Sequence, residues 1–162
     1  MSTADAVDRE VAWLTTSIND GLPNLLAANG GPWTSIQAYQ PRTPGRRNTY
    51  AILLRRAIHD KRFANVRRMP SYEFVLKLVW PMQSGTGSAE ADQRAFDAAV
   101  DKILQRIDGF VGDKTHGGRF RSVAENPEYV TVRFEDPAQT LPPEAEFRAE
   151  VTYYADDFEI TG

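Results

Sequence analysis

Apolar residues recur at helical spacing in two parts of the chain. The first group, near the start, is Val7, Val11, Leu14 and Ile18. Spacings of three and four predict an amphipathic helix there. Ser2 or Thr3 can cap it, and Asp5 and Asp8 suit the positive end of its dipole. A short second turn is expected over 22–26.

A second, longer helix is predicted over 88–111. Its apolar stripe is Phe96, Val100, Ile103, Leu104, Ile107 and Val111. Glu90 and Asp92 occupy its first turn, while Lys102 and Arg106 lie towards its end, as the helix dipole favours. Gly109 and Gly112 are expected to end it.

Alternating apolar and polar residues predict strands elsewhere. The strongest strand, at 71–80, has one apolar face made of Tyr72, Phe74, Leu76, Leu78 and Trp80. The strand at 145–154 has a similar face made of Phe147, Ala149, Val151 and Tyr153. Strands are also predicted at 33–40, 50–59 and 129–135, with a weak one at 119–124.

Three of these strands carry a face assignment that the structure can test. At 33–40 the shared face is expected to be Trp33, Ser35, Gln37 and Tyr39. At 50–59 it is expected to be Tyr50, Ile52, Leu54 and Ile58. At 129–135 it is expected to be Val130, Val132 and Phe134.

The order of elements predicts an α+β fold. It consists of a mostly antiparallel sheet of about four to six strands with two main helices packed on one face. The 162 residues suit one domain, 1–162. Residues 40–49, rich in proline and arginine, are predicted to form a mobile basic loop, and residues 61–70 a basic hairpin between two strands.

Composition favours an ordinary globular protein, with 41% hydrophobic and 25% charged residues. The chain has no cysteine, which excludes disulfides and thiolate chemistry and fits a reducing compartment. No apolar run approaches the ~20 residues of a membrane helix, and the polar N-terminus does not resemble a signal peptide. No membrane association is expected.

Candidate chemistry is sparse. The two histidines, His59 and His116, are interpreted as a strand and a turn residue, and no metal-ligand spacing surrounds them. The glycines at 85–87 lack the rest of a phosphate-binding or dinucleotide motif. The carboxylate pairs 135–136 and 156–157 are interpreted as solvated turns. We therefore expect no catalytic residue, no cofactor and no metal, and hence no enzyme.

Charge is strongly asymmetric along the chain. Nine basic residues against one acidic residue give 42–68 a local charge of +8, whereas 123–162 carries −8. Three interpretations of the basic segment stay open. It can be a solvated loop and hairpin, a nucleic-acid contact that neutralises phosphates, or a protein interface that pairs head to tail with acidic residues of a neighbour.

The layout resembles the tail terminator, or tail completion, proteins of long-tailed phages. The features shared are the N-terminal helix leading to the 33–40 strand, the basic hairpin followed by YEFVLKLVW at 72–80, the helix start AEADQRAFD at 89–97 and the strand FRAEVTYY at 147–154. The likeness covers nearly the whole chain. It lies in the order of elements, since this family has no invariant signature.

The resemblance implies a structural virion protein without catalytic residues or cofactor. Such proteins form a hexameric ring that caps the major tail tube protein, ends tail polymerisation and docks the head-completion or connector protein. Phage DNA passes through the lumen without sequence-specific binding. The implied location is the tail or neck of the virion, assembled in the host cytoplasm. Which face meets the tube is left open.

Alternatives are another head–tail connector component of the neck and a small nucleic-acid-binding module using 42–68. For the ring, the candidate basic interface residues are Arg42, Arg46, Arg47, Arg55, Arg56, Arg62, Arg67 and Arg68. The candidate acidic interface residues are Glu135, Asp136, Glu144, Glu146 and Glu150.

Overall fold

The computed structural model describes residues 2–18, 21–39, 49–64, 67–81, 89–109, 112–124, 130–135, 146–158 and 160–161. The helices are α1 (Thr3–Thr15), the short 3-10 helix η1 (Ala27–Asn29) and α2 (Ala89–Asp108). The strands are β1 (Ser35–Ala38), β2 (Tyr50–Ala64), β3 (Arg67–Pro81), β4 (Ser122–Val123), β5 (Thr131–Phe134), β6 (Glu146–Asp156) and β7 (Ile160–Thr161).

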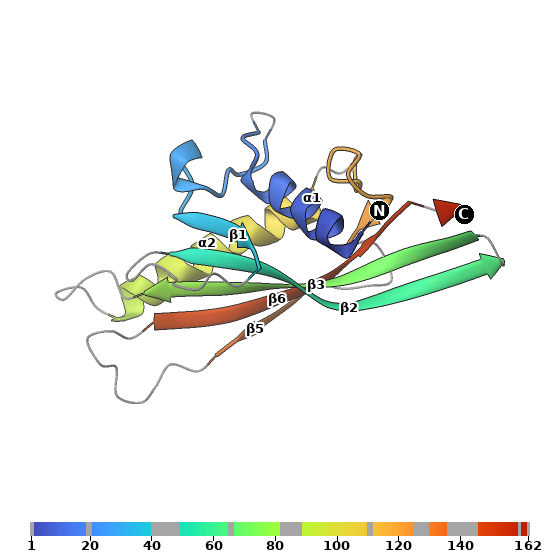
Figure 1. The fold of residues 1–162 in the computed structure, drawn as a ribbon. Helices are drawn as coiled ribbons and strands as arrows, with labels where there is room; N and C mark the ends of the chain where they lie inside the picture. The colour runs from blue at the N-terminus through green and yellow to red at the C-terminus, as the bar shows by residue number, and fades with distance from the viewer. Residues whose placement is uncertain are drawn as a thin grey trace.

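The strands form one curled sheet in the order β1-β2-β3-β6-β4. Strand β5 pairs with β6, and β7 pairs with the far end of β3. The pairing of β1 with β2 is parallel, and the other pairings are antiparallel. Helices α1 and α2 lie on the same face of this sheet (Figure 1). The predicted α+β fold, with two helices on one face, is confirmed.

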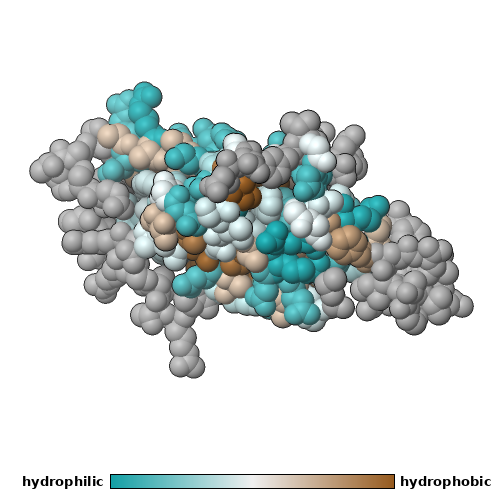
Figure 2. Space-filling view, turned by 90° about the horizontal axis from the view of Figure 1, so that it is seen from above, coloured by the Kyte–Doolittle hydropathy of each residue, from teal (hydrophilic) through white to brown (hydrophobic). Residues whose placement is uncertain are grey.

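The core lies between this face and the helices. Strands β3 and β6 contribute the predicted alternate residues, all of which are buried: Tyr72, Phe74, Leu76, Leu78, Trp80, Phe147, Ala149, Val151 and Tyr153. From α2 the core receives Phe96, Val100, Ile103 and Ile107, as the helical stripe predicts. Seen from the helix side, the surface is mostly hydrophilic, with small separate apolar patches, one of them where the hairpin leaves the body (Figure 2).

Helix α1 begins as its sequence predicts. The Ser2 side chain accepts from the backbone N–H of Asp5, while the Asp5 carboxylate accepts from the N–H of Ser2, which makes a complete capping box. The Ser2 hydrogen bonds lower the pKa of Asp5. The helix ends at Thr15, so Ile18 lies beyond it and packs against the core from the following segment.

Two sequence predictions near the start of the chain are wrong. The turn expected over 22–26 is replaced by η1 at Ala27–Asn29. In β1 the buried side chain is Ile36, whereas Gln37 is exposed, so the face expected for this strand is inverted. Trp33 is buried because it precedes the strand and bridges to Leu26 instead of alternating with its neighbours.

Strand β2 also departs from simple alternation. Ala51 and Leu53 face the helices, whereas Ile52 is buried on the other face, opposite Lys77 of β3. A β-bulge between Arg55 and Ala57 then shifts the register. Beyond it Ile58 lies beside Tyr72 of the core face, yet it is 47% exposed. Because a bulge inserts one residue, it exchanges the two faces along the rest of the strand.

Strands β2 and β3 form a long hairpin whose distal part projects beyond the helices (Figure 1). Each strand has 15 residues, and the sequence-predicted hairpin region is the distal part of these strands. The loop predicted at 40–49 lies outside the described residues except for its last position, Thr49, which is buried.

Candidate assembly surface

The basic residues of the hairpin gather at one end of the sheet. Arg62 of β2 lies opposite Arg68 of β3, and Arg67 is the first residue of β3. The backbone register thus brings three of the predicted basic residues to one end of the molecule. Arg42, Arg46 and Arg47 lie outside the described residues.

The opposite end of the same strands is acidic. Glu146, the first residue of β6, lies opposite Pro81, the last residue of β3. The N–H of Glu135 donates to the carbonyl oxygen of Arg148 over 3.0 Å, which places Glu135 opposite Arg148, near the same end of β6 as Glu146. Of the other predicted acidic residues, Asp136 and Glu144 lie outside the described residues, and Glu150 lies further along β6.

The two ends are far apart. Strand β3 runs 14 steps from Arg67 to Pro81, and at about 3.3 Å per residue this is roughly 46 Å. Part of the charge asymmetry along the sequence therefore becomes a separation in space, although Asp156 of the acidic segment lies opposite Ser71, towards the hairpin. The hairpin end is basic, and the end formed by Glu135 and Glu146 is acidic.

Part of the acidic end is already neutralised within the subunit. Arg148 donates to Glu146, with its Nε 3.0 Å from Oε1. This hydrogen bond is the main reason why the pKa of Arg148 is raised, and Glu135 adds a smaller effect. The pKa of Tyr50 is raised, first by burial and then by the charge of Glu146. Glu135 is the exposed carboxylate of the group.

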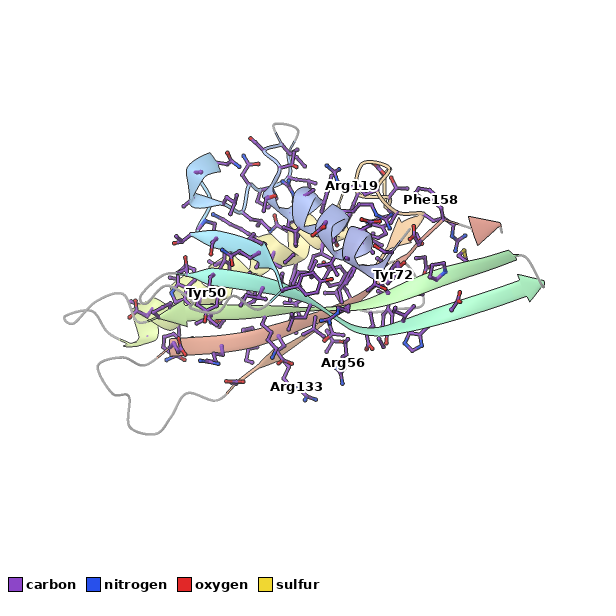
Figure 3. The ribbon with its side chains drawn as sticks, in the orientation of Figure 1. Tyr50, Arg56, Tyr72, Arg119, Arg133 and Phe158 are labelled. Carbon is purple, nitrogen blue, oxygen red and sulfur yellow. The ribbon has the colours of Figure 1, made fainter. Side chains whose placement is uncertain are left out.

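The face of the sheet that carries no helix has an internal charge row. Glu150 lies in register with Lys77 of β3 on one side and Arg133 of β5 on the other. Figure 3 shows Arg133, together with Arg56 of the bulge, pointing away from the helices. Opposite charges on neighbouring strands stabilise a sheet. Glu150 thus has two cationic neighbours in register within its own subunit, whereas Glu135 has one, Arg148, and is exposed.

An aromatic–arginine pair marks the place where β2 leaves the body. The Arg55 guanidinium lies 5.0 Å from the centroid of the Tyr39 ring, and the Tyr39 N–H donates to the Leu53 carbonyl. Tyr39 has φ of +65°, a conformation that costs a non-glycine residue about 1–3 kcal/mol. The adjacent bulge makes this the most irregular part of the described sheet, and no sequence signal marks it.

A buried polar cluster, which the sequence interpretation missed, lies under α1. Glu10 Oε1 is 2.6 Å from His116 Nδ1, and Glu10 Oε2 accepts from the Tyr153 hydroxyl over 2.7 Å. His116 Nε2 is 2.7 Å from the Ile107 carbonyl oxygen. The His116 ring stacks on Trp13 at 4.7 Å and 12°. His116 lies in a turn, as the sequence predicts, but its side chain is fully buried.

The hydrogen-bond partners indicate which atoms of this cluster carry protons. A carbonyl oxygen only accepts, so His116 Nε2 carries a proton. The short contact between Glu10 and His116 needs one further proton between them. Burial, and next the charge of Glu10, raise the pKa of Tyr153 well above 10.0. Glu10, His116 and Tyr153 are all fully buried, so the cluster is inaccessible and we assign it a structural role.

Two further buried charged residues, Arg106 and Asp157, lie in the same region. The Arg106 guanidinium donates to the carbonyl oxygens of Trp13, Pro23 and Thr16, which end α1 and begin the next segment. Burial lowers the pKa of Arg106 to about 10, so it stays charged at neutral pH. Asp157 is buried and pairs with Arg9 at 2.8 Å. The prediction that Asp157 belongs to a solvated turn is therefore wrong.

Metal-ligand groups and membrane-spanning helices are absent from the described part of the chain. Within it, no three histidine, cysteine, aspartate or glutamate side chains are grouped as metal ligands would be. No helix of that part is both long and apolar enough to span a membrane. No protein-family model matches the chain, and no curated protein matches it.

Proposed function

We propose that this chain is the subunit of a ring that caps the tail tube of a long-tailed phage. The ring ends polymerisation of the tube and presents its other side to the head or neck. The observation that carries the proposal is the separation of charge along β3, with a basic hairpin end and an acidic end about 46 Å apart.

Opposite charges at the two ends favour heterologous association. One subunit cannot bring its own ends together, because the extended strands of the sheet hold them apart. A neighbouring copy can meet the basic end with its acidic end. Contacts of this kind close into a ring when the rotation between copies allows it. Each exposed ion pair contributes only about 0–1 kcal/mol, but the pairs recur at every interface and select the neighbour.

The shape of the subunit supports the same function. The β2–β3 hairpin projects beyond the helix-covered body (Figure 1), so it can reach a neighbouring subunit or the ring below. The order of elements on which the resemblance to tail terminator proteins rests is also present in the structure. A capping subunit needs complementary surfaces and reach, and these are the features that the described residues provide.

Charge reversal at the hairpin tests the proposal. Arg67→Glu with Arg68→Glu should leave the monomer folded but impair ring formation, and tails assembled with it should have uncontrolled lengths under the electron microscope. The matched control, Arg94→Glu with Lys102→Glu, changes the net charge equally on the exposed side of α2. Normal tail lengths and infectivity with the hairpin variant would overturn the electrostatic basis of the proposal.

A nucleic-acid-binding module is the second candidate. It is favoured by the Arg55–Tyr39 pair and by exposed Arg56 beside it, because arginine and aromatic side chains contact phosphates and bases. On this alternative the same hairpin variant should bind DNA more weakly, with a shallower dependence of affinity on salt. Tail length would then be unchanged. A stable ring in the absence of DNA favours the tail proposal.

A further inference from the structure

The sheet has two edges that no described strand covers. Strand β1 pairs with β2 only as far as Leu53, so the stretch Leu54–His59 has β3 on one side and no described strand on the other. Strand β5 pairs with β6 on one side, and none of the described strands lies on its other side. An uncovered edge presents backbone N–H and C=O groups to which another strand can bind.

Exposed apolar side chains mark both edges. Ile58 on the β2 edge is 47% exposed and Phe134 on the β5 edge is 50% exposed. Both belong to the helix-bearing face, since Ile58 lies beside Tyr72 and Phe134 lies beside Ala149. The Phe134 ring also contacts Phe96 of α2, with centroids 6.0 Å apart. Two side chains that need cover thus lie on the same face at opposite edges.

We propose that the β2 edge of one copy pairs with the β5 edge of the next, so that the sheet continues from subunit to subunit. The strand directions suit this pairing. From β2 to β3, from β3 to β6 and from β6 to β5 each step is antiparallel, so β5 runs opposite to β2. When copies are related by rotation about the ring axis, β5 of one copy still runs opposite to β2 of the next. The two edge strands therefore pair antiparallel. Ile58 then packs beside Phe134 of the neighbour.

The offset between the two edges fits a closed arrangement. Ile58 lies level with Tyr72 of β3, whereas Phe134 lies level with Leu78 through Ala149. Six residues at about 3.3 Å give a stagger of roughly 20 Å per subunit. The four strands from β2 to β5, including the junction, are about 19 Å wide. The ratio of the stagger to the width corresponds to a tilt of about 45° between the strands and the ring axis, which lies within the range found in closed sheets.

Charge also complements across this junction. Glu135 directly follows β5 and is exposed, and Arg55 and Arg56 are exposed on the β2 edge. With Ile58 beside Phe134, the antiparallel register places Glu135 of the neighbour next to Ala57, adjacent to Arg56. Arginines and a bulge on an edge strand also prevent indiscriminate pairing. Here they favour an edge that carries a carboxylate.

This pairing rests on the proposed ring and adds a second contact to it, in which Glu135 meets the middle of β2 and the hairpin end with Arg67 and Arg68 extends beyond the junction. It can be tested without a phage, since the chain has no cysteine of its own. Single variants Ile58→Cys and Phe134→Cys, their mixture, and the double variant would be treated with an oxidant or a short bis-maleimide. Gels under non-reducing conditions show the products. Sedimentation measures, independently, whether each variant forms a ring.

The expected products are specific. The mixture should give dimers, the double variant should give a ladder of multimers, and each single variant should stay monomeric on the gel. Ala98→Cys with Phe134→Cys is the control, since Ala98 is exposed on α2 away from the β2 edge. Dimers from Ile58→Cys alone would show a two-fold contact and overturn the pairing. A ring in sedimentation without the ladder would overturn the pairing but leave the ring function standing. No association at all would overturn both.

Discussion

The carboxylate of Glu10 joins parts of the chain that are far apart in sequence. It contacts His116 in the loop after α2 and the Tyr153 hydroxyl in β6. A signal for it was present in the sequence, because Glu10 lies between Val7 and Leu14 on the apolar face of the first helix. A carboxylate on such a face needs partners. The identity of those partners depends on tertiary structure and could not be predicted.

Removal of this carboxylate should destabilise the protein strongly. Glu10→Ala leaves His116 Nδ1 and the Tyr153 hydroxyl buried without an acceptor, so the free energy of unfolding should fall by about 3–5 kcal/mol. Urea unfolding at pH 7 measures it. Glu90→Ala, which breaks an exposed ion pair with Arg94, should change it by less than about 0.5 kcal/mol. Equal effects of the two substitutions would contradict the structural role of the cluster.

The stability of the fold at alkaline pH should depend on Tyr153. Its pKa is raised well above 10.0 in the fold, so the folded state holds this proton more tightly than the unfolded state. The resulting stability is complete below pH 10 and is lost as the pH rises beyond it. Tyr153→Phe lacks this contribution. Wild-type unfolding midpoints should therefore fall more steeply than those of the variant above pH 10, and parallel curves would refute the assignment.

At the scale of elements, α2, β3 and β6 could be predicted because their apolar periodicity is regular and their environment matches it. The positions of strands β1 and β2 were also predicted, but their buried faces were not, and in β2 a bulge breaks the alternation on which a face prediction depends. The buried face of β2 includes Ala51, a small residue that a search for large apolar side chains passes over.

Helix α2 offers a direct test of the core. Ile103 is fully buried, so Ile103→Asp places an unpaired carboxylate among apolar side chains and should cost several kcal/mol, enough to unfold the domain. Thermal melting followed by circular dichroism measures this. Lys102→Asp alters the exposed neighbouring position and should keep the melting temperature within a few degrees. An unchanged melting temperature for Ile103→Asp would exclude this stripe from the core.

The join between α2 and the end of α1 depends on the shape of one guanidinium. Arg106 donates to three carbonyl oxygens at once, those of Trp13, Pro23 and Thr16. Lysine keeps the charge but lacks the planar fork, so Arg106→Lys should lower the free energy of unfolding by about 2–4 kcal/mol. Arg94→Lys on the exposed face is the control. Hydrogen exchange in 13–23 should also accelerate only in the Arg106 variant.

At the scale of the whole molecule, the sequence predicts that opposite charges are segregated but not where they lie. Register alone decides that Arg68 and Glu146 lie at opposite ends of the sheet. It also decides that Glu150 lies between Lys77 and Arg133, which makes it a weaker interface candidate than Glu135. Long-range strand pairing of this kind is not encoded in local periodicity.

A charge exchange tests the ring contact at this scale. Arg56→Glu or Glu135→Arg alone should weaken association, because each places like charges at the proposed junction. The two changes together restore opposite charges in swapped positions, so association should recover towards that of the wild type. Sedimentation at low and high salt measures this, and salt should reduce the differences. Failure of the double variant to recover would show that these two residues do not meet.

The bulge at Arg55–Ala57 determines which side chains of the distal part of β2 lie on the helix-bearing face. Before the bulge the odd-numbered residues of β2, such as Ala51 and Leu53, lie on the helix-bearing face. After it the even-numbered residues, such as Ile58, lie on that face. Deletion of Arg56 would remove the extra residue of the bulge, so that the two strands alternate regularly and Ile58 keeps its place opposite Tyr72 on the helix-bearing face. Relatives of this chain can therefore lose the bulge without changing which side chains of the distal hairpin face the helices.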